Sequence, residues 1–397
     1  MKYTIYGGSF DPFHLGHLRL IQAVLEQKLT KRLIVMPLGL APHKKHVQSM
    51  ATYRLEMVKR AVKNLKNVTV SDYEIKRPGK YSYTVDTVEH FRDLAGKSSA
   101  KVELIYGSDA LFSIEDWHRP AEIMANAKLM IAVRGHENRE VLESQKDYLV
   151  EKYGAKIKLF TMEPTDISST DLRADLQSGK DISKYVPAEV NKFLQANQPY
   201  AYLDDLGKLA LEQRISLARL EQKITPLLST YRLLHTLNVM HLAIHLASKH
   251  NYDLMKAALA GLLHDCTKDM PLKDQFKYAK KAGAPQVMNK NIAHGPAGSY
   301  YAKRFLGITD PEILTAIYYH TTSRVLMSTL DQIIYLADKC ELGRPYKNLD
   351  KLRDLADRDL TAAMKLCFAE VQQAFQQKGK KLHPLTVAAI KSLNNLQ

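Results

Sequence analysis

Two parts of the chain follow different hydrophobic patterns, and this contrast limits the possible folds more than any other feature. Up to about residue 195, short apolar runs alternate with segments of helical spacing. The runs cover residues 3–8, 33–38, 68–75, 102–107, 129–134 and 157–162. This alternation predicts an α/β domain with a doubly wound parallel sheet. After about residue 200 the strand pattern disappears, so the second part is predicted to be an all-α helical bundle.

The change of pattern also predicts the domain boundary. It falls within residues 196–205, where Pro199 ends the preceding helix. We expect a first domain over residues 1–198, a linker and leading helix over 199–224, and a second domain over 225–397. A length of 397 residues agrees with this division, because domains average roughly 150 residues.

The composition is that of an ordinary globular protein, with 45% hydrophobic and 25% charged residues. No run approaches the ~18 consecutive apolar residues of a membrane span, and the N-terminus lacks the pattern of a signal peptide. Three cysteines (Cys266, Cys340 and Cys367) cannot build a disulfide framework, which indicates a reducing compartment. The sequence therefore predicts a cytoplasmic protein that does not contact a membrane.

The net charge of +15 raises the question of nucleic-acid binding. A nucleic-acid surface needs longer basic clusters than Lys44-Lys45 and residues 378–381 provide. Anionic small substrates such as nucleotides are the better prediction, because a basic protein attracts them over a distance.

The first apolar run ends in a string suited to nucleotide chemistry, GGSFDPFHLGH at residues 7–17. Gly7 and Gly8 let the backbone approach a phosphate closely. His14 and His17 lie three residues apart at the mouth of a helix and can donate hydrogen bonds to a triphosphate. In a doubly wound sheet, ligands bind beyond the carboxyl ends of the strands. Two ordinary surface histidines are the structural alternative.

A second string, ISSTDLR at residues 167–173, follows the last apolar run. Ser168 and Ser169 precede a helix, so their hydroxyls and the first helical amides form an anion site. Arg173 lies one turn into that helix and can grip phosphate oxygens with its planar guanidinium. The alternative for the serines is an ordinary helix cap.

These strings, together with four others, carry a resemblance to a known family. The others are APHK (41–44), KYSYTVDTV (80–88), IYGSDAL (105–111) with Trp117 six residues later, and YVPAEV (185–190). Over residues 1–195 the chain resembles nicotinate-mononucleotide adenylyltransferases of the nucleotidyltransferase superfamily. The pantetheine-phosphate enzymes are the alternative, but they are not expected to combine SYTVDT with GSD and the tryptophan. The resemblance implies transfer of AMP from ATP to nicotinate mononucleotide, giving deamido-NAD and pyrophosphate with Mg²⁺.

The resemblance also implies roles for individual residues. Those expected to bind ATP are Gly7, Gly8, Ser9, Phe10, His14, His17, Gly107, Asp109, Ile167, Ser168, Ser169 and Arg173. Those expected at nicotinate mononucleotide are Lys44, Thr84, Trp117 and His118, with Trp117 stacking on the pyridine ring. The residues expected to act in catalysis are His14, His17, Lys44 and Arg173. A core aromatic is the alternative for Trp117, and a turn residue is the alternative for Asp109.

The second part of the chain contains a regular series of potential metal ligands. His264 and Asp265 end an apolar segment, and four further residues complete the series: His235, His294, His320 and Asp338. The gaps from His235 onward are 29, 30, 26 and 18 residues, about one helical hairpin each. Each ligand is therefore expected from a successive helix of one bundle, pointing inward. An isolated His-Asp pair is more often structural, but six ligands suggest two metal ions that clamp a phosphate.

The strings LLHD, HGP, YHTT and YLAD make this part resemble the HD-domain metal phosphohydrolases. Over roughly residues 225–375 the chain is similar to the bacterial family that hydrolyses diadenosine tetraphosphate symmetrically to two ADP. The ligand set suits iron, which the resemblance favours, with manganese or zinc as alternatives. The chain departs from the family pattern at Ser323, where glycine is expected, and at Leu342, which interrupts a Glu-Pro-Gly-Arg string.

Three basic residues follow the metal ligands closely and are expected to bind the polyphosphate: Lys268, Arg324 and Arg344. Asp265 and Lys268 are expected to act in catalysis, and a solvated lysine is the alternative for Lys268. Two other functions compete for the second part: a different nucleotide phosphohydrolase, or a nucleotide-binding regulatory module with a structural metal. An RNA-binding or RNA-processing phosphodiesterase is the third, supported only by the net charge. The oligomeric state is left open, and a homo-oligomer is compatible with the sequence.

Overall fold

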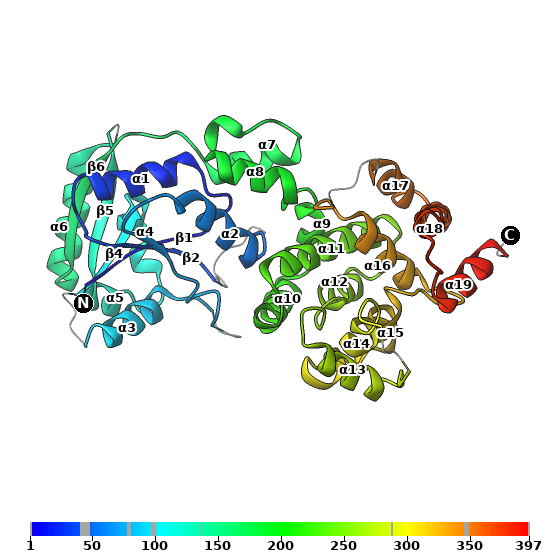
Figure 1. Ribbon diagram of the computed structural model, residues 1–397. Helices are drawn as coiled ribbons and strands as arrows, with labels where there is room; N and C mark the ends of the chain where they lie inside the picture. Colours follow the sequence, from blue (N-terminus) through cyan, green and yellow to red (C-terminus); the bar gives the residue numbers. More distant parts are fainter. Residues whose placement is uncertain are drawn as a thin grey trace. The chain divides into compact units, whose positions relative to one another are not determined.

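The computed structural model describes residues 2–39, 48–77, 81–96, 101–135, 137–286, 289–344 and 349–395. The chain divides into two compact units, Met1–Gln195 and Ala196–Gln397 (Figure 1). We describe each unit by itself.

The first unit is built on a six-stranded parallel sheet, which confirms the predicted α/β class. The strands are β1 (Tyr3–Gly8), β2 (Leu33–Pro37), β3 (Val68–Val70), β4 (Val102–Gly107), β5 (Lys128–Arg134) and β6 (Lys156–Met162). Their order is β3-β2-β1-β4-β5-β6, so the direction of winding reverses between β1 and β4. In the register of this central pair, Tyr6 lies opposite Ile105. Ligands bind at such a switch point, which here lies beyond Gly8 and Gly107.

Helices cover both faces of this sheet. The helices of this part of the chain are α1 (Leu15–Glu26), α2 (Ala51–Val62), α3 (Thr84–Leu94), α4 (Asp109–Ser113), α5 (Pro120–Asn126), α6 (Arg139–Tyr153), α7 (Ser169–Gln177) and α8 (Ala188–Asn197). Figure 1 shows α1 on one side of the sheet and α3 and α5 on the other. Val88 of α3 and Ile123 of α5 pack in one buried cluster with Leu104 and Ile131 of the strands. The central strands β1, β4 and β5 are buried along continuous stretches, as expected of a parallel sheet that is covered on both faces.

The third strand is shorter than predicted. The apolar run at 68–75 was expected to be one strand, but β3 ends at Val70. The chain then turns, and the amide of Lys76 donates to the carbonyl of Asp72 at 2.9 Å. The turn buries Glu74, whose carboxylate accepts a hydrogen bond from the Thr87 hydroxyl at 2.8 Å. The apolar pattern did not distinguish this buried turn from a strand.

Every regular element among the described residues of the second unit is a helix, as predicted. Its helices are α9 (Leu203–Gly207), α10 (Leu211–Ile224), α11 (Thr230–Lys249), α12 (Leu254–Leu263), α13 (Leu272–Lys281), α14 (His294–Phe305), α15 (Pro311–Tyr319), α16 (Thr329–Cys340), α17 (Leu349–Ala356), α18 (Leu360–Gln377) and α19 (Pro384–Asn394). Helices α11 and α16 carry the most buried residues of the bundle. Within the described residues, no helix combines the length and apolar character needed to cross a membrane.

Helix boundaries in this unit follow capping side chains. α11 begins at Thr230, because the Ser229 hydroxyl accepts from the amide of Arg232. α17 and α18 are separate helices, and the carboxylate of Asp359 caps the second.

Candidate functional site

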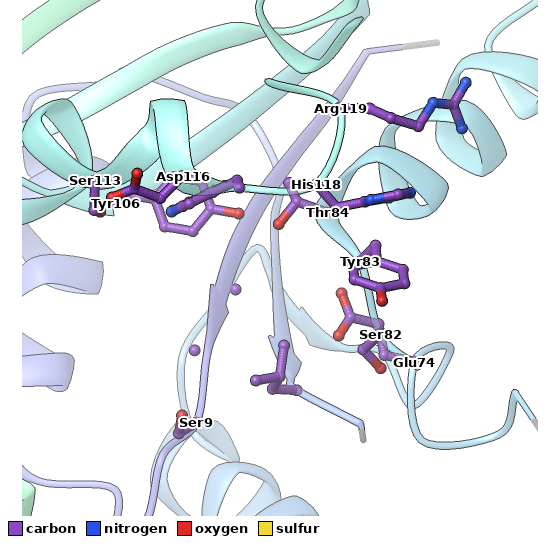
Figure 2. Close-up of a pocket in the computed structure, with 14 residues that line it drawn as sticks. Ser9, Glu74, Ser82, Tyr83, Thr84, Tyr106, Ser113, Asp116, His118 and Arg119 are labelled. Atoms are coloured by element: carbon purple, nitrogen blue, oxygen red, sulfur yellow. The ribbon is translucent and has the colours of Figure 1, made fainter. Parts of the chain in front are cut away.

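The first unit contains a cavity of about 910 Å³ at the switch point of the sheet. Its lining includes six residues predicted to bind substrates: Gly7, Gly8, Ser9, Thr84, Trp117 and His118. These come from the end of β1, from the start of α3 and from the segment just before α5, which the topology brings together. In Figure 2, Tyr106, Ser113 and Asp116 lie on one side, and Glu74, Ser82 and Tyr83 lie on the other. A volume of this size matches small-molecule sites, which are typically about 300–1,000 Å³.

Aromatic rings form a large part of the cavity wall. Trp117 meets Tyr106 edge to face, with ring centroids 5.0 Å apart. His118 packs against Tyr83 with centroids 4.2 Å apart. Trp117 is only partly buried and packs against the main hydrophobic cluster of the unit. It therefore has one side in the core and one side on the cavity, which a purely structural tryptophan does not require.

Glu74 is a cavity residue that the sequence did not single out. Burial raises the pKa of its carboxyl group, although hydrogen bonds from Thr87, Gly39 and Ser82 oppose the shift. A Cβ atom at Gly39 would collide with the carbonyl oxygen of Glu74, so only glycine fits there. Glu74 lies in the run 68–75, which was predicted to be a strand. No feature of the sequence distinguished it from an ordinary strand residue.

His14 and His17 are held in fixed orientations at the start of α1. Nδ1 of His14 accepts from the amide of Gly16 at 3.1 Å, and Nδ1 of His17 accepts from the amide of His14 at 3.1 Å. Because each Nδ1 accepts, the proton of the neutral ring sits on Nε2. The rings stack with centroids 3.7 Å apart. Burial, with a smaller contribution from Arg134, lowers the pKa of His14 to about 4. Its neutral ring is therefore a hydrogen-bond donor through Nε2 near pH 7.

The structure brings the residues 167–173 to the same loop that holds the histidines. The Ser168 side chain caps α7 by accepting from the amides of Thr170 and Asp171. The Ser169 hydroxyl donates to the carbonyl of Pro12 at 3.2 Å, and Arg173 donates to the carbonyl of Asp11 at 2.5 Å. Arg173 is 8% exposed, and its bond to Asp11 holds the loop in place. None of these residues lines the cavity described above.

The remaining residues predicted to bind ATP differ in how far they are exposed. Phe10 is 1% exposed, and its ring packs on those of Phe13 and His17, so only its backbone can reach a ligand. Asp109 is exposed as the first residue of α4, Ile167 is half-buried, and Gly107 ends β4. Lys44 lies outside the described residues.

Arg54 is a buried scaffold residue that the sequence did not reveal. Its guanidinium donates to the carbonyls of Ser9 at 3.2 Å, Leu38 at 2.6 Å and Gly39 at 3.4 Å. It therefore ties the loop after β1 to the loop after β2. In the sequence it reads as an ordinary helix residue.

The second unit brings the six predicted metal ligands into one buried cluster. Four lie at helix ends, because His264 and Asp265 follow α12, His294 begins α14 and His320 follows α15. His235 and Asp338 face inward from α11 and α16. All six are at least nine-tenths buried.

Asp265 lies between two groups of ligands. Its Oδ1 is 3.2 Å from His294 Nε2 and 3.4 Å from His320 Nε2. Its Oδ2 is 3.6 Å from His264 Nε2 and 3.8 Å from His235 Nε2. Asp338 Oδ1 completes the second group at 3.1 Å from His235 Nε2. One carboxylate thus offers an oxygen to each of two adjacent positions.

The imidazoles are oriented by bonds on their outer nitrogens. His264 Nδ1 lies 2.7 Å from the carbonyl of Gly261, and His320 Nδ1 lies 2.7 Å from that of Ile317. His235 Nδ1 lies 3.1 Å from Glu341 Oε1. A carbonyl can only accept, so the Nδ1 protons are donated outward and the Nε2 lone pairs point into the cluster. Metal-binding histidines are held in this way.

The cluster fits divalent metals on its own chemistry. Three buried atoms in it have no hydrogen-bond partner among the described residues: His235 Nε2, His264 Nε2 and Asp265 Oδ1. Such atoms are costly to bury unless something binds them. Burial raises the pKa of Asp265, but His264 and His294 beside it hold that pKa well below its usual value. The carboxylate is ionised, as a ligand must be.

Positive side chains surround this cluster. Lys268 Nζ lies 3.0 Å from His294 Nδ1, and Arg344 donates to Asp338 Oδ1 at 2.7 Å. Arg324 pairs instead with Asp331, which is not one of the six ligands, at 2.7 Å. Two cations were missed from the sequence: Arg232, 2.7 Å from Asp265 Oδ2, and Lys339, 2.8 Å from Asp338 Oδ2. Arg232 precedes His235 by three residues, and Lys339 directly follows Asp338. A search for basic residues within three positions of each predicted ligand would have identified both.

The three cysteines are all buried and free, in agreement with the absence of a disulfide framework. Cys266, next to the cluster, points its Sγ 3.8 Å from the carbonyl of Gly298. Burial raises the pKa of its thiol, so it is poorly suited to act as a thiolate ligand.

We expect the stability of the metal-free protein to fall as the pH is lowered from about 6.5 to about 4. Burial lowers the pKa of His241, which is not a predicted ligand, from 6.5 to about 4. Within this window the unfolded state binds more protons than the folded state, so stability rises with pH. The full shift corresponds to about 3 kcal/mol. Urea unfolding of wild-type and His241→Gln proteins measures this, and the variant should have the shallower pH dependence. Equal slopes would contradict a buried neutral His241.

Comparisons with known proteins follow this division of the chain. The cytidylyltransferase-like family model matches residues 5–175, and the HD domain model matches residues 232–343. A protein of Mycoplasma pneumoniae, named "probable nicotinate-nucleotide adenylyltransferase/Ap4A hydrolase", is 28% identical over 94% of this chain and 96% of its own length.

Two other relatives each match one half. A "probable nicotinate-nucleotide adenylyltransferase" of Clostridium botulinum is 34% identical over 50% of this chain and 98% of its own length. A crystal structure titled as a predicted HD superfamily hydrolase involved in NAD metabolism, from Clostridium acetobutylicum, is 34% identical with a TM-score of 0.42. It covers 45% of this chain and 97% of its own. The chain therefore belongs to the nicotinate-nucleotide adenylyltransferase family and carries an HD domain in its second half.

Proposed function

We propose that the first unit transfers the adenylyl group of ATP to nicotinate mononucleotide, giving deamido-NAD and pyrophosphate with Mg²⁺. The observation that carries this proposal is the aromatic cavity at the switch point of a nucleotidyltransferase-type sheet. The phosphate of the mononucleotide attacks the α-phosphorus of ATP, and pyrophosphate leaves. The Nε2–H groups of His14 and His17 donate to the phosphates as charge develops. Catalysis of this kind is mostly positioning and charge stabilisation.

In this proposal, the pyridine ring of nicotinate mononucleotide stacks on Trp117. The indole ring has an exposed side on the cavity and is held edge-on by Tyr106. Thr84 and the backbone near His118 line the same wall and are proposed to bind the carboxylate. Ser168, Ser169, Arg173 and Lys44 are proposed to act on the phosphates of ATP.

Replacing Trp117 with alanine should raise the KM for nicotinate mononucleotide several-fold and change the KM for ATP much less. Aromatic stacking is worth about 1 kcal/mol, which corresponds to roughly a several-fold change in affinity. Steady-state kinetics with each substrate varied in turn measure the effect. Trp117→Phe, which keeps a ring, serves as the matched control and should remain close to wild type. Equal increases for both substrates would mean that Trp117 supports the core instead.

We infer that the second unit is a metal-dependent phosphohydrolase that splits diadenosine tetraphosphate into two ADP. The observation that carries this inference is the position of Asp265 between two groups of ligands. His235, His264, Asp265 and Asp338 would hold one divalent metal, and Asp265, His294 and His320 would hold the other. Iron is the metal we propose, with manganese or zinc as alternatives. When bound, two such ions activate water and neutralise phosphate charge.

The side chains around the ligands have separate tasks in this proposal. Lys268 and Arg344 lie against the cluster and neutralise the polyphosphate where it approaches the metals. Arg324 reaches phosphate only by leaving Asp331. Elemental analysis of anaerobically purified protein, followed by a panel of nucleotide substrates, tests the proposal. A metal-loaded protein without turnover on any nucleotide would favour a regulatory module.

A further inference from the structure

The helical unit contains a cavity of about 520 Å³ that is lined by none of the six predicted metal ligands. Its walls come from α16, α18, the segment before α14 and the segment that leads into α19. Tyr335 and Lys339 lie one turn apart on α16, and Phe375 lies near the end of α18. All of these elements belong to the same compact unit.

One end of this cavity lies beside the metal-ligand cluster. Lys339, which lines the cavity, places its Nζ 2.8 Å from Asp338 Oδ2. Thr321 also lines the cavity and directly follows the predicted ligand His320. The Thr321 hydroxyl lies close to Gly295, where an added Cβ atom would be 3.5 Å from it. That hydroxyl is buried and has no hydrogen-bond partner among the described residues. A ligand in the cavity can therefore reach the edge of the cluster.

The lining favours an anionic ligand that has a flat ring. It includes two lysines, Lys339 and Lys381, and no carboxylate among the described residues. Phe375 and His383 supply rings, and the His383 ring is fixed because its Nδ1 accepts from the amide of Leu385 at 3.3 Å. Phe375 is 36% exposed, so its ring is available for stacking. Base–aromatic stacking and lysine–phosphate contacts together recognise nucleotides.

We propose that this cavity binds one nucleoside diphosphate half of the dinucleoside polyphosphate. The diphosphate lies near Lys339 and Lys381, and the base lies against Phe375 and His383. The bond to be hydrolysed is then at the Lys339 end, next to Asp338. This inference rests on the proposed hydrolase function and adds to it the place where one product half is held.

Product inhibition of the full-length, metal-loaded protein tests this site. ADP and inorganic pyrophosphate are each used as inhibitors of diadenosine tetraphosphate hydrolysis, so that the readout reports only the second unit. Phe375→Ala should weaken inhibition by ADP about tenfold, because stacking on a base is lost, and leave inhibition by pyrophosphate unchanged. Lys381→Ala should weaken both. Lys380→Ala removes an exposed neighbouring charge outside the lining and is the matched control.

Metal content should be the same in all three variants, because none of the residues is a proposed ligand. If Phe375→Ala and Lys381→Ala are inhibited like Lys380→Ala, the proposed site is wrong, while the hydrolase function stands. If the wild-type protein does not hydrolyse diadenosine tetraphosphate, the function is wrong, and the site is then tested by photolabelling with 8-azido-ADP. Labelling of residues 371–386 that Phe375→Ala removes would support the site. Labelling confined to residues 1–195 would overturn it.

Discussion

Replacing Asp265 with alanine should remove bound metal and lower the rate of nucleotide hydrolysis by more than about a hundredfold. Losing only an outer partner of a metal ligand typically costs about 10–100-fold. The loss of the Asp265 carboxylate is expected to lower the rate further than this, because its two oxygens lie within 3.8 Å of four imidazole nitrogens. Without this carboxylate the four histidines are left with Asp338 as the remaining acidic ligand. Elemental analysis and initial rates on the same preparation measure both effects.

Cys266→Ala is the matched control for this change. Cys266 is the next residue, equally buried, and its thiol faces the carbonyl of Gly298. We expect this variant to keep its metal and most of its hydrolytic rate. Full metal content in Asp265→Ala would contradict the arrangement in which Asp265 serves both metal positions.

Replacing His17 with alanine should lower adenylyl transfer by about a hundredfold or more and leave nucleotide hydrolysis unchanged. Removing one hydrogen-bond donor aimed at a developing negative charge costs about 10²–10³ in rate. Hydrolysis is expected to survive, because the six metal ligands all lie in the other compact unit. Assays of both reactions on one preparation of the variant measure the two effects together.

A second substitution separates the donor role of His17 from its structural role. Nδ1 of His17 accepts from the amide of His14 and helps to begin α1. His17→Asn keeps an acceptor at that place and lacks a donor at the position of Nε2. It should have a melting temperature close to wild type and a transfer rate as low as that of His17→Ala. A transfer rate close to wild type would show that His17 acts only as a cap.

The sequence predicted the architecture because hydrophobic periodicity differs between the two units. A parallel sheet buried on both faces produces continuous apolar runs such as 129–134, and each of the six strands overlaps one of the predicted runs. The prediction failed where a buried segment is not a strand. Tyr73 and Ile75 alternate with acidic residues as in a strand, yet this segment turns and places Glu74 on the cavity.

The metal site was predictable, because potential ligands recur at intervals of about one helical hairpin. His264, His294 and His320 stand out because they follow one another at intervals of 30 and 26 residues. Residues whose role depends on a distant partner were not predictable. Arg54 bonds to carbonyls of two separate loops, and Lys339 reaches a cavity that α18 and α19 complete. Such roles depend on tertiary contacts, which no local pattern encodes.

Hydrolysis of diadenosine tetraphosphate by the wild-type protein in heavy-oxygen water tests the assignment of the second unit most directly. Water attacks one of the two central phosphorus atoms, and the other half leaves as ADP. Mass spectrometry of the products should show ADP alone, with one heavy oxygen in half of the ADP molecules. Equal amounts of AMP and ATP would contradict the symmetric cleavage, and the absence of any hydrolysis by the metal-loaded protein would contradict the phosphohydrolase itself.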